Sequence, residues 1–599
     1  MAIRVSKLAK ELNIGLVQLE SMLNTLGYQE DFFSPNSKIP DAIAVLVRGL
    51  RSDDTSLLKL VEIAANEGVY GYKTDTTPSL KIVDQIDLDE YSRQRGNTKR
   101  LKYDNNAPFV TPPLKYSENQ DFWIRELVLL SPKNEANGIN LGFFGEADKQ
   151  PLYSVLIGTN GAGKSMLMKE IVDFFIDLHA CIDGTEQRLS NVNKGRLKGI
   201  WYHIDGVECE VISLGRNFYA RIDGCFRTLK DLRLPSIVAC HFGAFDKLPV
   251  QTINGSPQTR YDVPWYKYVG AHVNGSMISS SAIAFRLLFA LNEQMDNRQR
   301  QNICSILDFI GYDHTISLSY SFVQKSKKDG AAREAIVQRI DKDREYNSLS
   351  KQGKNNVVNQ LYNFYKNKTA TGKTRFDYDI RFDGDSASEG SLDELSYIYK
   401  LKQCELVSSA VVIFHKQGAN ITSHNMSSGE FAMLSTVLSI SAAANDPHTL
   451  VLLDEPELSL HPNWQMTLID NLDRALANKV CHLLIATHSH MLVSDLPLNR
   501  SSVTHTERDI NGNLISATIS ENTFGWSAEE VLFKVFKTAT DRNRYFGERI
   551  GKLLEQMGNN TISPEDVTGE LTELQEISMH LSDIDPMKMV LNTIVEAYK

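Results

Sequence analysis

One segment of the chain has the residue types and spacing needed to bind nucleotide phosphates. It is Gly158-Thr-Asn-Gly-Ala-Gly-Lys-Ser165, which fits the pattern G-x-x-x-x-G-K-[ST] in full. Glycines let the backbone wrap closely around phosphate oxygens, the lysine reaches the terminal phosphates, and the serine hydroxyl binds Mg²⁺. The segment therefore predicts binding of ATP and magnesium through Gly158, Thr159, Asn160, Gly161, Ala162, Gly163, Lys164 and Ser165.

A second segment carries paired carboxylates. In Thr449-Leu-Val-Leu-Leu-Asp-Glu-Pro456 an apolar run ends in two adjacent acids. Asp454 is the expected second residue of the magnesium shell, and Glu455 is expected to polarise the attacking water. One acid would suffice to bind the metal. The adjacent second acid therefore favours hydrolysis over nucleotide storage.

The glycine-rich segment and the paired acids both need strands and helices that hold them in place. The apolar run Leu152–Ile157 directly precedes the glycines, and the helical pattern Met166–Phe175 follows them, which is the strand, loop and helix order that a phosphate loop requires. Another apolar run begins at Leu483 and ends at His488. Short apolar strands around a helix indicate a domain of the α/β class.

Two further regions show simpler patterns. Residues 196–250 alternate strand-like runs with Asp-Gly pairs at 205–206 and 223–224, and such pairs suit hairpins, so we expect antiparallel sheet through this region, including Ile237–Cys240. Residues 280–405 are charged and predict mainly helix. Within them Thr371-Gly-Lys-Thr374 imitates the end of a phosphate loop, but no apolar strand immediately precedes it, so we expect a polar turn.

At the N-terminus, apolar residues recur at helical spacing through residues 1–50 and are interrupted near Asn13 and Gly15, which predicts two short helices around a turn. This segment resembles the small N-terminal helical module of bacterial translation initiation factor two and, loosely, a helix-turn-helix. The polar residues 93–118 are typical of a linker.

The segment Ser427-Ser-Gly-Glu430 is similar to the signature of ABC ATPases, although Met426, Ser428 and Glu430 depart from its usual residues. It precedes Asp454 by 27 residues, which leaves room for one helix and one strand. The resemblance implies that Ser427 and Gly429 contact the γ-phosphate of ATP held by an opposite subunit. It also implies that His488 is the switch histidine and that two chains form a head-to-tail dimer around ATP.

The segment Glu457-Leu-Ser-Leu-His-Pro462 is similar to RecF, OLD and related ATPases and disfavours a membrane transporter. Phe242–Asp246 resembles the loop that replaces the glutamine switch of transporters. The tail around Thr523–Phe533 and the Tyr268–Gly270 stretch resemble the PtuA-like ATPases of Septu and retron antiphage systems. That resemblance implies control of a separate HNH nuclease of the PtuB type. Only 109 residues follow His490, so we expect no nuclease in the same chain.

Two other functions stay open at this point. A RecF-like or SMC-like repair ATPase would use the same head to clamp DNA, although the chain shows no heptad run long enough for a coiled-coil arm. A scaffold or sensor would bind ATP with little turnover. The basic residues at 325–328 and 333–344 either follow a phosphate backbone or form a solvated helical face, so DNA, or the RNA and DNA of a retron, stays open as a partner.

Composition narrows the class of protein. The net charge of −10 gives no overall basic field, and the seven cysteines are scattered without a C-x-x-C pair, as expected of reduced thiols. No apolar run is long enough to cross a membrane, so we expect a cytoplasmic protein without membrane contact.

Together these features predict an α/β fold, namely an ABC-type P-loop ATPase head with a mixed sheet and a helical lobe, preceded by a small helical module. The expected divisions are 1–50, the helical module; 51–117, a helical segment and linker; 118–279, the lobe with the phosphate loop and antiparallel sheet; 280–425, a helical insertion; 426–520, the signature, paired acids and switch histidine; and 521–599, a helical tail.

Overall fold

The structure is a computed structural model. It describes residues 2–25, 34–51, 57–66, 122–130, 136–141, 150–158, 161–184, 196–215, 217–243, 246–251, 260–273, 276–277, 280–292, 297–323, 329–342, 346, 349–383, 391–458, 460–477, 479–508, 514–519, 523–526, 530–531, 550–553, 571–572, 574–575, 578 and 586–597. The expected linker at 93–118 lies outside these residues.

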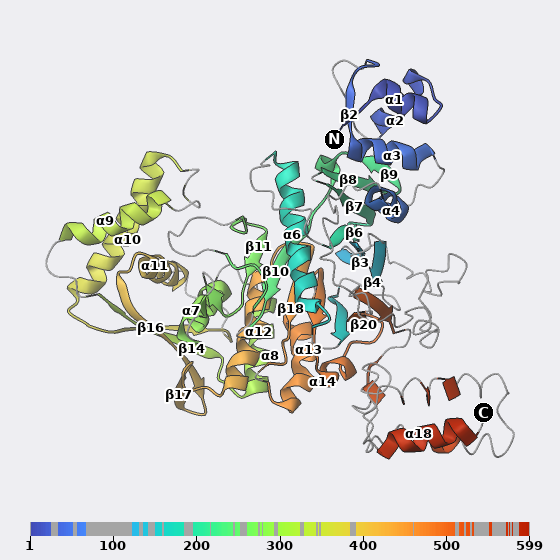
Figure 1. Ribbon diagram of the computed structural model, residues 1–599. Coiled ribbons are helices and arrows are strands. Elements are labelled where there is room, and N and C mark those ends of the chain that lie inside the picture. The colour runs from blue at the N-terminus through green and yellow to red at the C-terminus, as the bar shows by residue number, and fades with distance from the viewer. Residues whose placement is uncertain are drawn as a thin grey trace, which may run out of the picture.

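A seven-stranded sheet forms the centre of the protein (Figure 1). Its first six strands run parallel, and the last pairs antiparallel with its neighbour. In spatial order the strands are β11 (Tyr266–Tyr268), β10 (Ser236–Cys240), β18 (Thr449–Asp454), β19 (Cys481–Ala486), β5 (Leu152–Gly158), β20 (Ser501–Arg508) and β21 (Leu514–Thr518). Asp454 and Glu455 therefore lie at the end of β18 and His488 lies just after β19, next to the strand that enters the phosphate loop.

Alternate residues of the central strands face two different cores. Leu450 and Leu452 of β18 pack with α6 (Lys164–Ile182), whereas Val451 and Leu453 face a helical layer on the other side. That layer is α7 (Ser280–Asn292), α8 (Asn297–Ile310), α12 (Ser428–Ala443), α13 (Pro462–Ala475) and α14 (His490–Ser494). Because both faces are covered, these strands read as continuous apolar runs, as parallel strands usually do.

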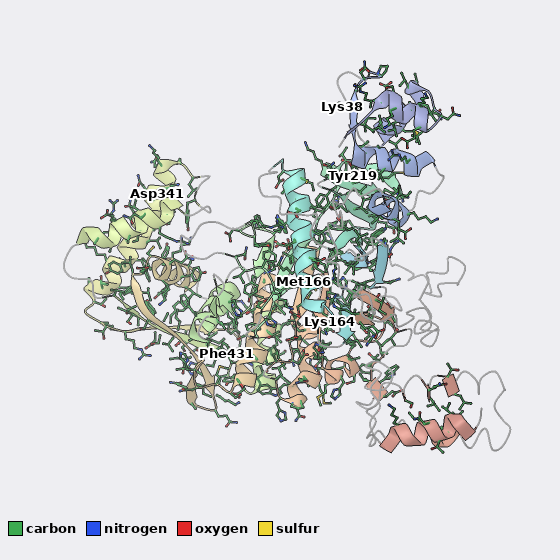
Figure 2. All side chains as sticks on the ribbon, viewed as in Figure 1. Lys38, Lys164, Met166, Tyr219, Asp341 and Phe431 are labelled. Carbon is green, nitrogen blue, oxygen red and sulfur yellow. The ribbon has the colours of Figure 1, made fainter. Side chains whose placement is uncertain are left out.

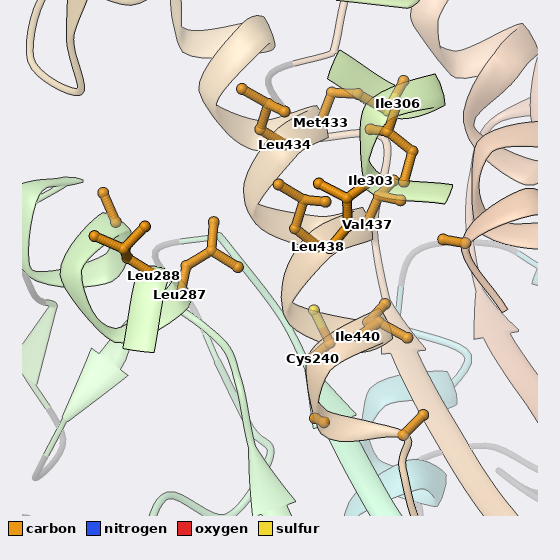
Figure 3. Close-up of a cluster of buried hydrophobic side chains, with 14 of the residues drawn as sticks. Cys240, Leu287, Leu288, Ile303, Ile306, Met433, Leu434, Val437, Leu438 and Ile440 are labelled. Carbon is orange, nitrogen blue, oxygen red and sulfur yellow. The ribbon is translucent and has the colours of Figure 1, made fainter. Parts of the chain in front are cut away.

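Helix α12 is the centre of the helical layer. Figure 3 shows Met433 and Val437 of this helix beside Ile303 and Ile306 of α8, and Ile440 beside Cys240 of β10. Twelve of its sixteen residues are buried, so the helix is covered on nearly every side. Each fully buried Leu, Ile, Val or Met side chain contributes about 2 kcal/mol to the free energy of unfolding. The segment Ser427–Glu430 therefore begins a helix that the core holds in place.

A six-stranded antiparallel sheet covers the other side of α6. Its strands in spatial order are β4 (Ala136–Asn140), β3 (Phe122–Leu130), β6 (Leu197–Ile204), β7 (Val207–Leu214), β8 (Asn217–Ile222) and β9 (Cys225–Arg227), followed by a short 3-10 helix η3 (Leu229–Asp231). Asp205 and Asp223 adopt positive φ angles of 52° and 47°, so each Asp-Gly pair forms the predicted hairpin turn.

The prediction of antiparallel sheet is wrong for the last strand of this region. Ser236–Cys240 is strand β10, which lies between β11 and β18 of the central sheet and runs parallel to both. Its residues from Ile237 to Cys240 are all buried, which fits a strand covered on two faces rather than one. Two-residue strands β12 (His272–Val273) and β13 (Ser276–Met277) form a separate hairpin beyond β11.

The N-terminal segment packs against the outer face of the antiparallel sheet. Its elements are β1 (Ala2–Arg4), α1 (Val5–Glu11), α2 (Leu16–Thr25), β2 (Lys38–Pro40), α3 (Asp41–Arg51) and α4 (Leu57–Asn66). Leu8, Val45 and Leu60 share one core with Trp201 and Tyr219 of the sheet. The turn between α1 and α2 contains Asn13 at a positive φ of 53°.

Residues 280–425 are not helical throughout. A four-stranded antiparallel sheet crosses this region, in the order β15 (Phe376–Arg381), β14 (Thr315–Phe322), β16 (Val407–Lys416) and β17 (Ala419–Thr422). With it pack α9 (Asp329–Lys342), α10 (Lys351–Ala370) and α11 (Ser391–Gln403). Helix α10 ends at Ala370, and Gly372 has a φ of 69°, so Thr371–Thr374 forms the expected turn.

The architecture confirms the predicted α/β class with a mixed sheet and a helical layer. Towards the C-terminus the longest described element is α18 (Pro586–Ala597). Among the described residues, no helix is both long and apolar enough to span a membrane.

Candidate active site

The phosphate loop joins β5 to the N-terminus of α6. Gly161 and Gly163 have φ angles of 82° and 106°, in the left-handed region that favours glycine. Such a turn directs backbone N–H groups towards the start of the helix, where the helix dipole also favours an anion. Thr159 and Asn160 lie outside the described residues, whereas Gly158, Ala162 and Ser165 lie on either side of this turn.

Lys164 is a buried cation without a carboxylate partner in the described part of the chain. Only 6% of the residue is exposed. Its Nζ donates to the carbonyl of Gly158 at 3.0 Å and lies 2.8 Å from Nε2 of His488. Burial lowers the pKa of Lys164 to about 8, although Glu455, Asp454 and Glu457 nearby partly offset this effect. An anion at the helix start would supply the missing negative charge.

Ser165 and Asp454 bring two oxygen atoms together beside this lysine. The Ser165 hydroxyl donates to Oδ1 of Asp454 at 3.0 Å. Burial raises the pKa of Asp454, and the hydrogen bond from Ser165 opposes that change. A hydroxyl and a carboxylate next to a phosphate site form the oxygen donor set that Mg²⁺ prefers. The two predicted magnesium ligands therefore fit the ion.

Glu455 has a strained backbone. Its φ of 48° lies in the left-handed region, where a non-glycine residue costs about 1–3 kcal/mol. Two hydrogen bonds hold it there. The N–H of Glu455 donates to the carbonyl of Ala486 at 2.8 Å, and His241 Nδ1 lies 2.9 Å from the carbonyl of Asp454. Because a carbonyl can only accept, Nδ1 carries the proton and fixes the peptide that precedes Glu455.

The other nitrogen of this histidine is buried as well. His241 is 2% exposed, and its Nε2 has no hydrogen-bond partner among the described residues. A Cβ added to Gly243 would lie 2.6 Å from this nitrogen, so the glycine lets the loop pass close to the ring. The sequence pattern of Phe242–Asp246 begins one residue after His241, but no pattern pointed to His241 itself. Its position directly after strand β10 was the available signal.

His488 and Glu457 form a second pair at the site. Oε1 of Glu457 accepts from the N–H of His488 at 2.7 Å and so holds the backbone of this histidine. Burial and the nearby Lys164 lower the pKa of His488, and burial also raises the pKa of Glu457. Since Lys164 donates to His488 Nε2, the imidazole accepts there and is neutral in this arrangement.

The segment after Glu457 leads into α13. His461 is the N-cap of this helix, and Pro462 occupies its first turn, where proline is favoured. The Leu-His-Pro sequence therefore has a local structural role as a helix start. It places α13 directly after the strand that ends in the paired acids.

Ser427 and Gly429 lie at the start of α12, away from the phosphate loop. Figure 2 labels Phe431 in the first turns of α12 and shows it well separated from Lys164. The Ser427 hydroxyl and the Glu430 carboxylate form a reciprocal capping box, and Lys416 donates to Glu430 at 2.8 Å. Despite partial burial, these hydrogen bonds keep the pKa of Glu430 below its ordinary value.

Arg508, at the end of β20, also contacts the phosphate loop. Its Nε donates to the carbonyl of Gly161 at 2.9 Å, and a Cβ on Gly163 would lie 2.8 Å from its Nη2. No sequence pattern pointed to this arginine. It lies more than 340 residues after the loop, and only the pairing of β20 with β5 brings the two together.

The structure thus gathers Lys164, Ser165, Asp454, Glu455 and His488 in one place. It adds three residues that were not predicted as site residues, namely His241, Glu457 and Arg508. It leaves Ser427 and Gly429 outside this group.

Comparison with known proteins gives partial matches. Residues 327–495 match a family model described as "AAA domain, putative AbiEii toxin, Type IV TA system". The protein described as "Retron Vc95 probable ATPase", from Vibrio cholerae serotype O1 biovar El Tor, is 28% identical over 127 residues, which are 20% of this chain and 24% of that protein. The chain thus matches about a quarter of the relative's length.

Among solved structures, the SMC head bound to the C-winged helix domain of ScpA gives a TM-score of 0.28 at 12% identity, over 66% of this chain and 98% of that chain. The SMC head domain from Thermotoga maritima gives 0.27 at 11% identity, over 66% and 99%. Because both TM-scores are low, the assignment of the fold rests on the strand order and loop geometry described above.

Proposed function

We propose that this protein binds ATP with Mg²⁺ and hydrolyses it, and that it works as an ABC-type switch. The observation that supports this proposal best is the buried ammonium of Lys164, which has no carboxylate partner among the described residues and lies at a glycine-lined helix start. A terminal phosphate is the ligand whose charge and oxygen atoms fit that position.

In this proposal the residues have separate tasks. Ser165 and Asp454 would hold Mg²⁺, which supplies charge neutralisation to the β- and γ-phosphates. Lys164 donates to the γ-phosphate in place of His488, and this exchange frees the histidine Nε2. Glu455 orients the attacking water and accepts its proton, in the position fixed by His241. Glu457 keeps the backbone of His488 beside the phosphate.

We further propose that two chains form a head-to-tail dimer. Ser427 is the N-cap of α12, four residues before Phe431, and Figure 2 shows Phe431 apart from Lys164 of the phosphate loop. The serine can serve a nucleotide only if a second copy presents it across an interface. ATP would then hold two heads together, and hydrolysis would release them.

At the cellular level we propose a cytoplasmic role in bacterial antiphage defence, in which the ATPase controls a separate HNH nuclease. This step is supported by the partial likeness to the retron ATPase and by the tail and loop segments noted in the sequence. The identity of the neighbouring genes tests this proposal. An adjacent HNH nuclease or reverse transcriptase gene would support it, and a repair operon would favour the DNA-clamp alternative.

Steady-state ATP turnover tests the catalytic proposal. Lys164→Ala should abolish nucleotide binding, whereas Glu455→Gln should bind ATP normally but lower kcat by about 10²-fold or more. Lys230→Ala removes an exposed lysine of η3, outside the motifs assigned to the site, and should leave turnover unchanged. Unchanged turnover in the Glu455 variant would refute the assignment. Addition of DNA to the same assay separates a DNA clamp, whose turnover should rise, from a scaffold, whose turnover stays slow throughout.

Mixing two inactive variants tests the dimer. Lys164→Ala removes the phosphate-binding function of its own chain, and Ser427→Arg blocks the site completed on its partner. A mixed head-to-tail dimer contains one intact site, so random mixing should restore activity up to about a quarter of the wild-type value. If each chain completes its own site, no mixture recovers activity, and the dimer proposal is wrong.

A further inference from the structure

A basic segment lies away from the active site, on α10 and the turn that follows it. Between Ser350 and Phe376 the chain has no aspartate or glutamate, although 74 of its 599 residues are acidic. The same segment carries six basic residues, namely Lys351, Lys354, Lys366, Lys368, Lys373 and Arg375. The segment is therefore basic within a protein whose net charge is −10.

One face of α10 is an exposed stripe of amide side chains. Val358 and Leu361 on the opposite face are buried in the core of the insertion. The exposed amides recur at helical spacing along the whole helix and are Gln352, Asn355, Asn356, Asn359, Gln360, Asn363 and Asn367. Over its 20 residues the helix is about 30 Å long. We call this set the amide stripe.

Five of the six basic residues fall into two groups, and the sixth, Arg375, donates to the hydroxyl of Ser319. Lys368 pairs with Glu394 at 2.6 Å, and Lys354 lies 3.9 Å from Asp341, so both have acidic partners. By contrast Lys351, Lys366 and Lys373 are exposed, and none of them has an acidic partner among the described residues. These three lie at the start, near the end and just beyond the end of the stripe.

The neighbouring helix extends this surface. Arg333 of α9 donates to the side-chain oxygen of Asn359 at 3.0 Å, which places a guanidinium at the middle of the stripe. Figure 1 shows α9 and α10 on the side of the molecule away from α6. A ligand on this surface would therefore leave the nucleotide site accessible.

We propose that the amide stripe and its three free lysines bind nucleic acid. Ammonium groups contact phosphates, and amides both donate to and accept from base and sugar edges, so the two residue types suit the two parts of one polymer. The absence of carboxylates from the segment removes the repulsion that phosphates would otherwise meet. The proposal does not depend on ATP hydrolysis.

Fluorescence anisotropy of the full chain tests this proposal. The probes are a labelled 30-base-pair DNA duplex, one of its single strands and an RNA duplex of the same length. Lys351→Glu, Lys366→Glu and Lys373→Glu are combined in one variant. Arg227→Glu, Lys230→Glu and Lys552→Glu, at exposed sites elsewhere, give a control with the same change in net charge.

The wild type should bind at least one probe, and the α10 variant should bind it at least tenfold more weakly, while the control stays within about twofold. Each lost phosphate contact also lowers the slope of log K against log salt by about 0.9 for duplex DNA, so the slope should fall by up to about 3. Replacing Asn355, Asn359 and Asn363 by alanine should weaken binding with little change in this slope. Far-UV circular dichroism checks that each variant is folded.

Two results would overturn the proposal. One is equal loss of binding in the α10 variant and in the charge-matched control, which would indicate a nonspecific effect of net charge. The other is failure of the wild type to bind any of the three probes, in which case the stripe belongs to a protein partner.

Discussion

His482 joins the central sheet to the antiparallel sheet through a hydrogen bond, and its protonation provides a test of that contact. It is fully buried in β19, where its Nδ1 accepts from the N–H of Ile124 at 3.0 Å and its Nε2 lies 2.9 Å from the hydroxyl of Ser154. Since Nδ1 accepts, Nε2 carries the proton and donates to Ser154. A second proton would have to face the N–H of Ile124. Burial without a counter-charge accordingly lowers the pKa of His482 to about 3.

This shift makes the free energy of unfolding depend on pH. The folded pKa is depressed, so the unfolded chain takes up the proton first as the pH falls, and stability is lost below the ordinary pKa of about 6.5. Each pH unit between about 6.5 and 3 is worth about 1.4 kcal/mol. Between pH 7 and pH 5, His482 should therefore lower the free energy of unfolding by about 2 kcal/mol.

Other buried groups titrate in the same range, so the test compares variants. His482→Asn keeps an acceptor for Ile124 and removes the titration. Urea unfolding at pH 7 and pH 5, followed by tryptophan fluorescence, gives the stability of each variant at each pH. The difference between wild type and variant should change by about 2 kcal/mol between the two pH values. His424→Asn, at an exposed position, is the control. An identical pH dependence in wild type and His482→Asn would refute the reasoning.

Three further substitutions have expected results. His241→Ala should lower kcat with little change in KM for ATP, because Glu455 loses its backbone support; His241→Asn, whose amide can donate like Nδ1, should restore part of the rate in the same steady-state assay. Glu430→Ala should lower the free energy of unfolding by about 1 kcal/mol through loss of the capping box, and Glu430→Gln should lower it less in urea titrations. Gly270→Ala should lower the melting temperature, because the new Cβ would lie 2.2 Å from the hydroxyl oxygen of Tyr268, at a cost of about 1–3 kcal/mol. The control Gly330→Ala, whose new Cβ would meet no atom within 4 Å, should leave the melting temperature unchanged.

The parts of the fold that could be predicted are those with local signals. The strand before the phosphate loop, the glycines and the following helix are consecutive, so their pattern predicts the strand, turn and helix that the structure contains. The hairpins at Asp205 and Asp223 were predictable for the same reason, since two residues determine the turn. Periodicity and turn-forming residues are patterns of a few consecutive residues, so they predict structures that are equally local.

Partner choice between strands has no such local signal. Ile237–Cys240 reads as an apolar run, and nothing in those residues distinguishes a last antiparallel strand from a parallel strand inserted beside β18. The missed sheet in residues 280–425 has a different cause. Its strands lie among long charged helices. Strand β14 (Thr315–Phe322) has only 8 residues, and a short apolar run of that kind does not distinguish a strand from the buried side of a helix. Pairing between β14 and β16 spans about ninety residues, and short-range patterns do not record it.

The same limit explains which site residues were missed. Lys164, Ser165, Asp454 and Glu455 belong to motifs whose chemistry can be read from consecutive residues. His241 and Arg508 act on those motifs through single hydrogen bonds to backbone carbonyls, and any histidine or arginine at the end of a strand would look the same in the sequence. Their importance arises because β10 and β20 lie next to β18 and β5. A residue that acts by holding another residue's backbone becomes recognisable only when the strand order is known.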